Sequence, residues 1–293
     1  MLTVKNLRKN FKSTKILNNL NLTIESNQRV ALVGHNGCGK TTLIRCLLGL
    51  YQYEGQIEIF GLNIKTEREK ALKHIAFVPQ APPSLKGTVK EILELNANLC
   101  EFDLQNIHPI ARELGLNLND CLSTPFKNLS GGMKQKLLIS IALTRQPALL
   151  IMDEPSANLD PKARAVFFKL LSKLPKDTTM LLTSHRVDEL SGIVSRVIEL
   201  DNGIMTMDDV VEASAEDNVF TEKSFCSLKL KKLPDSVKLA LQDWGFDHDE
   251  TDPLNWKGTI ASADRFRFHA TLTRWSGIIE NVTMNKIHEE EQL

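Results

Sequence analysis

The sequence lacks several features that mark secreted, metal-binding and nucleic-acid-binding proteins. Its 5 cysteines are scattered and include no Cys-x-x-Cys pair, so neither a disulfide framework nor a zinc site is indicated. Its 36 basic and 36 acidic residues cancel and form no basic block, which disfavours binding to nucleic acid or to an anionic membrane surface. We therefore expect a protein of the reducing cytosol that does not bind nucleic acid.

Long hydrophobic runs are also absent from the sequence. No window approaches the roughly 20 apolar residues that a membrane-spanning helix needs. Residues 1–7 lack the basic start and the apolar core of a secretory signal. Any membrane association is therefore expected to depend on a partner protein, which would hold the chain as a peripheral subunit on the cytoplasmic face of the inner or plasma membrane.

The length of 293 residues favours one large α/β domain followed by a smaller one. The continuous apolar run at 30–33 predicts a strand covered on both faces, as in a parallel sheet. Strands are predicted at 2–4, 20–24, 30–33, 148–152, 180–183, 196–200 and 204–206, and helices at 41–48, 110–114 and 132–146. We predict a doubly wound α/β domain over residues 1–215, with a helical insert at about 86–146 where Thr88 and Glu91 have the spacing of a capping box.

Residues 216–293 differ in composition and carry no recognisable nucleotide chemistry. Apolar and polar residues alternate at 226–230 and 278–284, as they do in strands, and 256–261 is predicted to be another strand. Val237, Leu241, Phe268 and Leu272 have helical spacing. The tail is therefore predicted to be a small α+β domain in the order β-α-β-α-β. Two roles stay open for it: a module that senses a ligand or partner, and an appendage that stabilises a dimer or increases solubility.

A glycine-rich loop follows the strand at 30–33 and precedes a predicted helix. It fits the pattern G-x-x-x-x-G-K-[ST], in which backbone N–H groups and a helix N-terminus bind phosphate oxygens. Lys40 is expected to reach the β- and γ-phosphates of ATP, and the Thr41 hydroxyl to ligate Mg²⁺. The predicted nucleotide-binding residues here are Gly34, His35, Asn36, Gly37, Cys38, Gly39, Lys40, Thr41 and Thr42.

Two carboxylates, Asp153 and Glu154, follow the strand at 148–152. In an open α/β sheet this position lies beside the phosphate loop. Asp153 is expected to hold Mg²⁺, and Glu154 to polarise the water that attacks the γ-phosphate. The alternative, a pair of acids before Pro155 at a helix start, is disfavoured by the buried strand that precedes them.

Ser130, Gly131 and Gly132 stand at the start of the helix predicted at 132–146. The helix N-terminus and the serine hydroxyl form a second candidate anion site, although such a segment on its own is more often an ordinary serine N-cap. One chain then carries two binders of the γ-phosphate in different parts of the fold. Unless both features fold onto one nucleotide, two chains are expected to share each nucleotide.

Over about residues 1–205 these motifs, in this order, resemble the nucleotide-binding subunit of ABC (ATP-binding cassette) transporters. The phosphate loop corresponds to the Walker A motif of that family, 129–133 to its signature and 149–154 to its Walker B motif. The resemblance implies a P-loop NTPase fold with a RecA-like mixed sheet, an N-terminal antiparallel β subdomain and a helical insert. It also implies a head-to-tail dimer that closes on two ATP molecules.

The same resemblance implies roles for residues outside these motifs. Gln80 stands where the family has a glutamine that meets Mg²⁺ or the attacking water, and His185 where it has a histidine that contacts the γ-phosphate. Phe11 precedes Lys40 by 29 positions, where the family places an aromatic residue that stacks on adenine. A buried core phenylalanine is the alternative. Residues 156–160 resemble the D-loop.

Two positions need separate comment. Met133 stands where many members of the family have glutamine, but Ser130 and Gly132 are present. Cys38 lies inside the phosphate loop, where a neighbouring lysine and a helix N-terminus are expected to acidify its thiol and make it reactive. A small, passive filler is the alternative for Cys38.

The sequence thus predicts an Mg²⁺-dependent ATPase that binds and hydrolyses ATP as a subunit of an ABC transporter. Its expected partners are a second copy of the chain or a homologous cassette, and separate transmembrane permease subunits. A soluble ABC ATPase acting on a macromolecular complex is the alternative, but a second cassette, a long coiled coil and a basic surface are lacking. A single cassette with a short C-terminal domain resembles ATPases of bacterial exporters, so export is expected. The Gly-His-Asn-Gly opening of the loop also resembles the ATPase of nitrous oxide reductase maturation.

Overall fold

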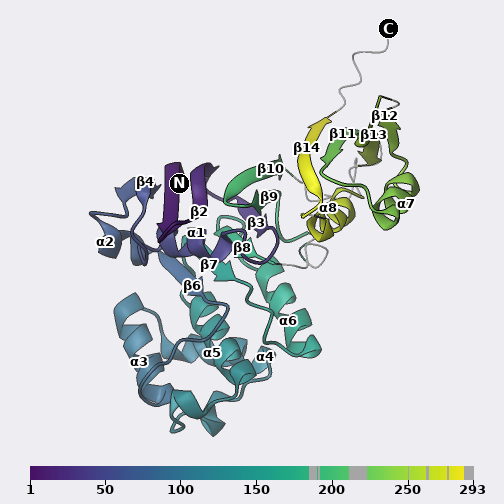
Figure 1. Cartoon of the computed structure of the whole chain (residues 1–293). Coiled ribbons are helices and arrows are strands. Elements are labelled where there is room, and N and C mark those ends of the chain that lie inside the picture. Colours follow the sequence, from purple (N-terminus) through teal and green to yellow (C-terminus); the bar gives the residue numbers. More distant parts are fainter. Residues whose placement is uncertain are drawn as a thin grey trace.

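The computed structural model describes residues 1–184, 190, 192–210, 223–249, 251–261, 264–275 and 277–286. Within these residues the chain forms three sheets. Figure 1 shows the N-terminal sheet at the upper left, a layer of helices at the bottom and the C-terminal domain at the upper right. His185 and the domain boundary predicted at 215/216 lie outside the described residues.

The N-terminal sheet is antiparallel, in the order β2-β1-β4-β5. Its strands are β1 (Leu2–Phe11), β2 (Thr14–Ile24), β4 (Glu54–Ile59) and β5 (Leu62–Asn63). Leu2 and Ile57 are buried in the same cluster as Leu43 of the helix α1 (Lys40–Leu47). The predicted N-terminal antiparallel subdomain is confirmed, and β4 and β5 extend it beyond the two strands that the alternation predicted.

The central sheet has the order β10-β9-β3-β8-β7-β6, in which all neighbours are parallel except β10 and β9. Its strands are β3 (Arg29–Val33), β6 (Ile75–Val78), β7 (Leu149–Asp153), β8 (Thr179–Thr183), β9 (Arg196–Asp201) and β10 (Ile204–Val210). The helices α2 (Arg68–Leu72) and α6 (Pro161–Ser172) complete this part. Both β7 and β8 are buried along their whole length, which confirms the predicted doubly wound sheet.

The helical insert forms a layer with a core of its own, which includes Ile92, Phe126 and Leu137. Its elements are α3 (Val89–Cys100), η1 (Leu104–Asn106), α4 (Ile107–Glu113), η2 (Leu118–Asp120), η3 (Phe126–Asn128) and α5 (Gly131–Thr144). The predicted capping box is present: Glu91 N donates to Thr88 Oγ1 at 3.3 Å, and Thr88 N donates to Glu91 Oε2 at 2.7 Å. The layer begins and ends within the range predicted for the insert.

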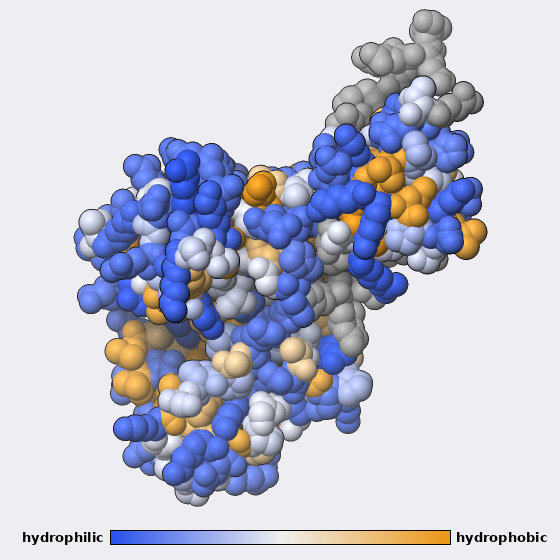
Figure 2. Space-filling view, in the orientation of Figure 1, coloured by the Kyte–Doolittle hydropathy of each residue, from blue (hydrophilic) through white to orange (hydrophobic). Residues whose placement is uncertain are grey.

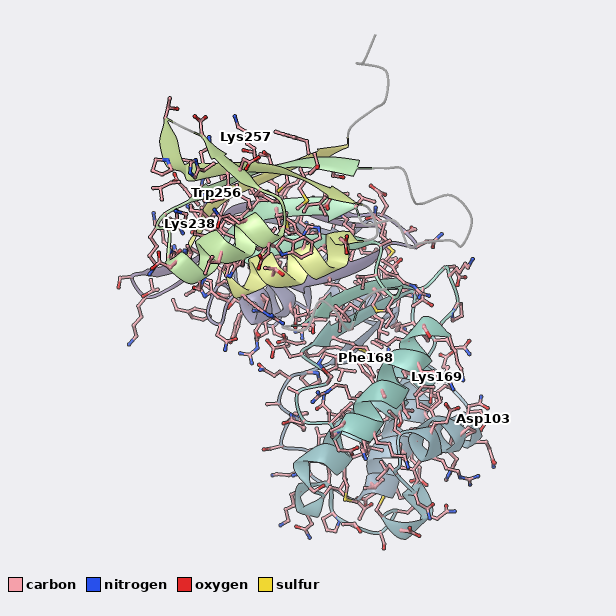
Figure 3. The ribbon with its side chains drawn as sticks, turned by 90° about the vertical axis from the view of Figure 1, so that its right-hand side faces the viewer. Asp103, Phe168, Lys169, Lys238, Trp256 and Lys257 are labelled. Atoms are coloured by element: carbon pink, nitrogen blue, oxygen red, sulfur yellow. The ribbon has the colours of Figure 1, made fainter. Side chains whose placement is uncertain are left out.

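The C-terminal domain has an antiparallel sheet in the order β12-β13-β11-β14. Its elements are β11 (Lys223–Leu230), α7 (Asp235–Asp243), β12 (Asp247–Asp249), β13 (Asp252–Ala261), α8 (Arg265–Arg274) and β14 (Ile279–Lys286). This is the β-α-β-β-α-β arrangement of ferredoxin-like domains. Figure 3 shows both helices against one face of the sheet, and Trp256, Phe268 and Leu272 are buried between the layers. The predicted order missed only β12, a strand of three residues.

The C-terminal domain packs on the edge of the central sheet, with β14 beside β10 (Figure 1). Met207 of β10 belongs to the same hydrophobic cluster as Phe268 and Leu272 of α8. The two domains therefore share one continuous core. Among the described residues, no helix has the length and apolarity that crossing a membrane requires.

Candidate nucleotide-binding site

The parallel strands of the central sheet end at one edge, where the phosphate loop, Gln80 and the acidic pair at 153–154 meet. Because β3 lies between β9 and β8, the phosphate loop that follows β3 is flanked by the ends of both neighbouring strands. A cavity of about 410 Å³ opens at this edge. Its lining residues are Ile16, Asn36, Gly37, Gly39, Lys40, Thr41, Thr42, Gln80 and Glu154.

The phosphate loop is held tightly against β9. A Cβ atom at Gly34 would lie 2.1 Å from the carbonyl oxygen of Leu200, so no larger residue fits at this position. The buried Lys40 ammonium donates hydrogen bonds to the carbonyl oxygens of Gly34, at 2.7 Å, and of His35, at 3.1 Å. Its positive charge is therefore fixed within the loop and beside the cavity.

The acidic pair at the end of β7 divides into a buried and a cavity-facing carboxylate. Asp153 is 2% exposed, and its Oδ1 accepts a hydrogen bond from Thr183 Oγ1 at 2.8 Å. Thr183 Oγ1 in turn accepts from the backbone N–H of Glu154 at 2.8 Å. Glu154 lines the cavity and has a φ of 43°, in the left-handed region, which turns the chain sharply after the strand.

Gln80 and Glu154 come from neighbouring strands and meet over the cavity. Gln80 Nε2 donates to Glu154 Oε2 at 3.3 Å, and Asn158 Nδ2 donates to the carbonyl oxygen of Gln80 at 3.0 Å. The fully buried Gln135 of α5 supports both segments, since its Nε2 lies 3.3 Å from Pro79 O and 3.1 Å from Pro155 O. The helical layer is thus hydrogen-bonded to the backbone next to Gln80 and next to Glu154.

Two more acids lie behind the phosphate loop, on β9. Burial, helped by the nearby Asp201 carboxylate and opposed by a Thr206 hydrogen bond and by His35, raises the pKa of Glu199 to about 7. The His35 ring lies with Nε2 2.9 Å from Asp201 Oδ1. His35, predicted to bind nucleotide, therefore turns its ring toward β9, whereas the next residue, Asn36, lines the cavity.

Cys38 corrects one expectation. Its thiol is 1% exposed, and burial raises the pKa of the Cys38 thiol although the neighbouring Lys40 acts in the opposite direction. The predicted acidified and reactive thiol is therefore wrong. The passive-filler alternative describes this residue, because desolvation outweighs the positive charge of the loop.

The Ser-Gly-Gly segment lies at the N-terminus of α5. Ser130 is the N-cap, and its Oγ accepts a hydrogen bond from the backbone N–H of Met133 at 3.2 Å. Ser130 and Gly131 are exposed. Among the described residues that line the cavity, none comes from 130–132.

Phe11 also lies outside the cavity lining as described. It is 41% exposed and packs edge-on against Tyr51, with the ring centroids 5.2 Å apart, while Lys9 Nζ lies 4.7 Å from its ring centroid. The core alternative for Phe11 is therefore wrong. Stacking on adenine stays a prediction.

The residues at the sheet edge fit a magnesium nucleotide. Thr41 and Gln80 line the cavity with a hydroxyl and an amide oxygen, and Asp153 supplies a carboxylate directly before Glu154. These are the oxygen donors that Mg²⁺ prefers. The cavity therefore combines a fixed cation, Lys40, with a set of oxygen donors, as binding of a nucleoside triphosphate with Mg²⁺ requires.

Comparison with known proteins decides the family. Residues 17–157 match the family described as ABC transporter. The energy-coupling factor transporter ATP-binding protein EcfA1 of Leuconostoc mesenteroides is 30% identical over 277 residues, covering 88% of this chain and 97% of that protein. The chain belongs to the ABC transporter ATP-binding subunits. The methionine import ATP-binding protein MetN of Francisella tularensis is 31% identical over 274 residues, or 87% of this chain and 77% of that protein.

Other similarities of this ABC cassette support the fold. A structure of an ATP-binding subunit of an ABC transporter superimposes with a TM-score of 0.66 at 28% identity, covering 72% of this chain and 90% of that chain. ATP-binding cassette sub-family A member 2 of Rattus norvegicus is 34% identical over 206 residues. That match covers 68% of this chain, which spans only 8% of the length of that relative.

Three residues of the cassette site were not predicted from the sequence: Thr183, Gln135 and Asp201. Thr183 is the last residue of β8, so its place at the sheet edge was available as a signal. Gln135 follows Gly131 by four positions, on the same face of α5. Asp201 follows the strand predicted at 196–200, but nothing in the sequence places β9 next to β3 and so beside the phosphate loop.

Proposed function

We propose that the chain binds and hydrolyses ATP with Mg²⁺ as half of a head-to-tail dimer that drives separate transmembrane subunits. The observation that carries the proposal is the separation of two anion-binding features. Lys40 lines the cavity, whereas the exposed N-terminus of α5 at Ser130 and Gly131 contributes nothing to the described cavity lining. A second copy, or a homologous cassette, supplies the missing helix N-terminus to each nucleotide.

Different residues of this chain have different proposed roles in ATP binding and hydrolysis. Lys40 binds the β- and γ-phosphates, and the loop N–H groups hold their oxygens. Glu154 orients a water molecule and accepts its proton, while Gln80 holds the Glu154 carboxylate in place. Thr41, Gln80 and Asp153 would hold Mg²⁺, which when bound would offset the charge of the phosphates. His185 is proposed to donate a hydrogen bond to the γ-phosphate, and Phe11 to stack on adenine.

Exposed hydrophobic side chains support a membrane-embedded partner. Leu95 and Leu99 on α3 are 56% and 69% exposed, and Leu50 is 51% exposed. Figure 2 shows hydrophobic surface at the left of the molecule, over the region of α3. We propose that separate permease subunits cover this surface and hold the chain on the cytoplasmic face of the membrane.

Export is the direction that we propose, because a single cassette with a short C-terminal domain resembles exporter ATPases. Purification in mild detergent would identify the permease that binds the chain. The substrate of that permease should then be taken up into inside-out vesicles when ATP is supplied, as expected of an exporter. Uptake of the substrate only into right-side-out vesicles would show import.

Cross-linking tests the shared site. One tagged chain carries Asn36→Cys and a differently tagged chain carries Ser130→Cys, both at exposed positions and both with Cys100→Ser to lower background labelling. A short bis-maleimide should join the two chains when ATP is present. Each variant alone is the control and should give little product. Lack of an ATP-dependent product from the mixture would contradict the head-to-tail dimer.

A further inference from the structure

We propose that Asp201 is a positioning residue of the phosphate loop and that the C-terminal domain holds it in place through Lys231. The inference rests on the proposed function, since it concerns the affinity of the same site for nucleotide. It gives the C-terminal domain a role in setting nucleotide affinity. Two observations support it: the Asp201 carboxylate contacts both His35 and Lys231, and the hairpin between β9 and β10 packs against the phosphate loop.

The hairpin between β9 and β10 lies directly behind the phosphate loop. The backbone N–H of Gly203, in its turn, donates a hydrogen bond to the carbonyl oxygen of Cys38 at 2.9 Å. The preceding Leu200 carbonyl occupies the space beside Gly34. Because these contacts involve backbone on both sides, a shift of the hairpin is transmitted to the loop.

Asp201 connects this hairpin to both domains. Its Oδ1 lies 2.9 Å from Nε2 of His35 in the phosphate loop. Its Oδ2 lies 3.5 Å from Nζ of Lys231, the first residue after β11 of the C-terminal domain. The Asp201 side chain is only 11% exposed, so its carboxylate is held mainly by these protein contacts, although Lys231 is 45% exposed.

A second contact fixes the other strand of the hairpin. His269 of α8 is fully buried, and its Nε2 lies 2.8 Å from Oδ2 of Asp209 on β10. The C-terminal domain therefore contacts the end of β9 through Lys231 and β10 through His269. The hairpin lies between that domain and the phosphate loop, and within the part of the chain that the structure describes Asp201 contacts a side chain of each, His35 and Lys231.

The variant Lys231→Met tests this arrangement with little risk to folding, because Lys231 is 45% exposed. The matched control is Lys257→Met: Lys257 is 51% exposed and lies 3.9 Å from Asp249 within the C-terminal domain. Calorimetry on the full chain would measure the Kd for ADP with Mg²⁺. We expect Lys231→Met to weaken binding by about two- to fivefold, the range for one partly exposed ion pair, with wild-type kcat retained. Lys231→Arg should restore the wild-type Kd.

A double-variant cycle separates positioning from a general structural role. If Lys231 acts through Asp201 on His35, then adding Lys231→Met to His35→Ala should leave the Kd of His35→Ala unchanged. The inference would be overturned if Lys231→Met had the same Kd for ADP as Lys257→Met. It would also be overturned if the fold-changes in Kd caused by Lys231→Met and His35→Ala multiplied in the double variant. Either result would leave the proposed function intact. Failure of the wild-type chain to bind ADP would overturn both.

Discussion

Gln80 Nε2 donates a hydrogen bond to Glu154 Oε2 across 3.3 Å, although the two residues are 74 positions apart in the chain. The bond joins the ends of β6 and β7, and Asn158 and Gln135 hold the backbone on either side of it. Gln80 therefore positions the carboxylate that is proposed to activate water. The segment that carries Gln80 also leads into α3 of the helical layer, so Gln80 connects that layer to Glu154.

Replacement of Gln80 should affect turnover more than binding. We expect Gln80→Ala to lower kcat about tenfold or more, because Glu154 loses its orienting donor, while the KM for ATP stays within about twofold. Steady-state ATPase assays would measure both constants. Gln56→Ala on β4, at an exposed position, is the control and should retain wild-type kcat. A rise in KM with unchanged kcat would contradict the positioning role.

Two glycines with nearly the same φ test the hairpin behind the phosphate loop. Gly203 has a φ of 76° and a Cβ there would lie 2.1 Å from Ile16 O, whereas Gly245 has a φ of 73° and open space around a Cβ. Gly245→Ala should cost only about 1–2 kcal/mol of backbone strain and leave the nucleotide Kd unchanged. Gly203→Ala should lower the melting temperature further and weaken nucleotide binding. Equal effects of both variants would argue against close packing of the hairpin.

The buried thiol of Cys38 should react slowly. Cys38 is 1% exposed with a raised pKa, whereas Cys100 is partly exposed at the end of α3. Mass spectrometry after brief treatment with a maleimide at neutral pH should show Cys100 modified long before Cys38. Faster labelling of Cys38 would show that the phosphate loop opens readily from β9.

Glu199 should make stability depend on pH. Its pKa rises from an ordinary 4.5 to about 7 on folding, mainly because of burial, with Asp201 adding to the shift and His35 opposing it. The folded state thus binds the proton more tightly, so the contribution of Glu199 is favourable below about pH 4.5 and is lost as the pH rises through about 7. The free energy of unfolding of Glu199→Gln should therefore rise relative to that of the wild type as the pH rises from about 4.5 to about 7, by on the order of 1–3 kcal/mol.

Chemical unfolding of both chains at several pH values would measure this gain. Glu58→Gln, at an exposed position on β4, is the matched surface control. A difference between Glu199→Gln and the wild type that does not change between pH 4.5 and pH 8 would contradict a raised pKa for Glu199.

The sequence predicted most of the central sheet because its strands are short apolar runs that end in functional residues. The run at 30–33 became β3, and the run before Asp153 became β7, each within one residue at either end. The C-terminal order was predicted for a related reason, since Phe268 and Leu272 have the helical spacing that α8 shows. Periodicity is reliable where one face of an element is buried.

Contacts between distant segments could not be predicted in this way. Gln135 and Thr183 are polar residues whose partners are set by the order of strands and by the docking of α5, which sequence spacing does not encode. The reactivity expected of Cys38 failed for a similar reason, because a nearby Lys40 is visible in the sequence but the degree of burial is not. Asp201 acquires its two partners only when β9 lies next to β3 and the C-terminal domain packs on β10.

The most direct test of the shared site is the mass of the Glu154→Gln chain in solution with saturating Mg²⁺ and ATP. Light scattering coupled to gel filtration should show twice the 32.9 kDa of one chain, because ATP is bound but barely hydrolysed. Adding Ser130→Arg to the same chain should keep ATP binding and return the mass to 32.9 kDa. A Glu154→Gln chain that binds ATP and stays at 32.9 kDa would contradict the account.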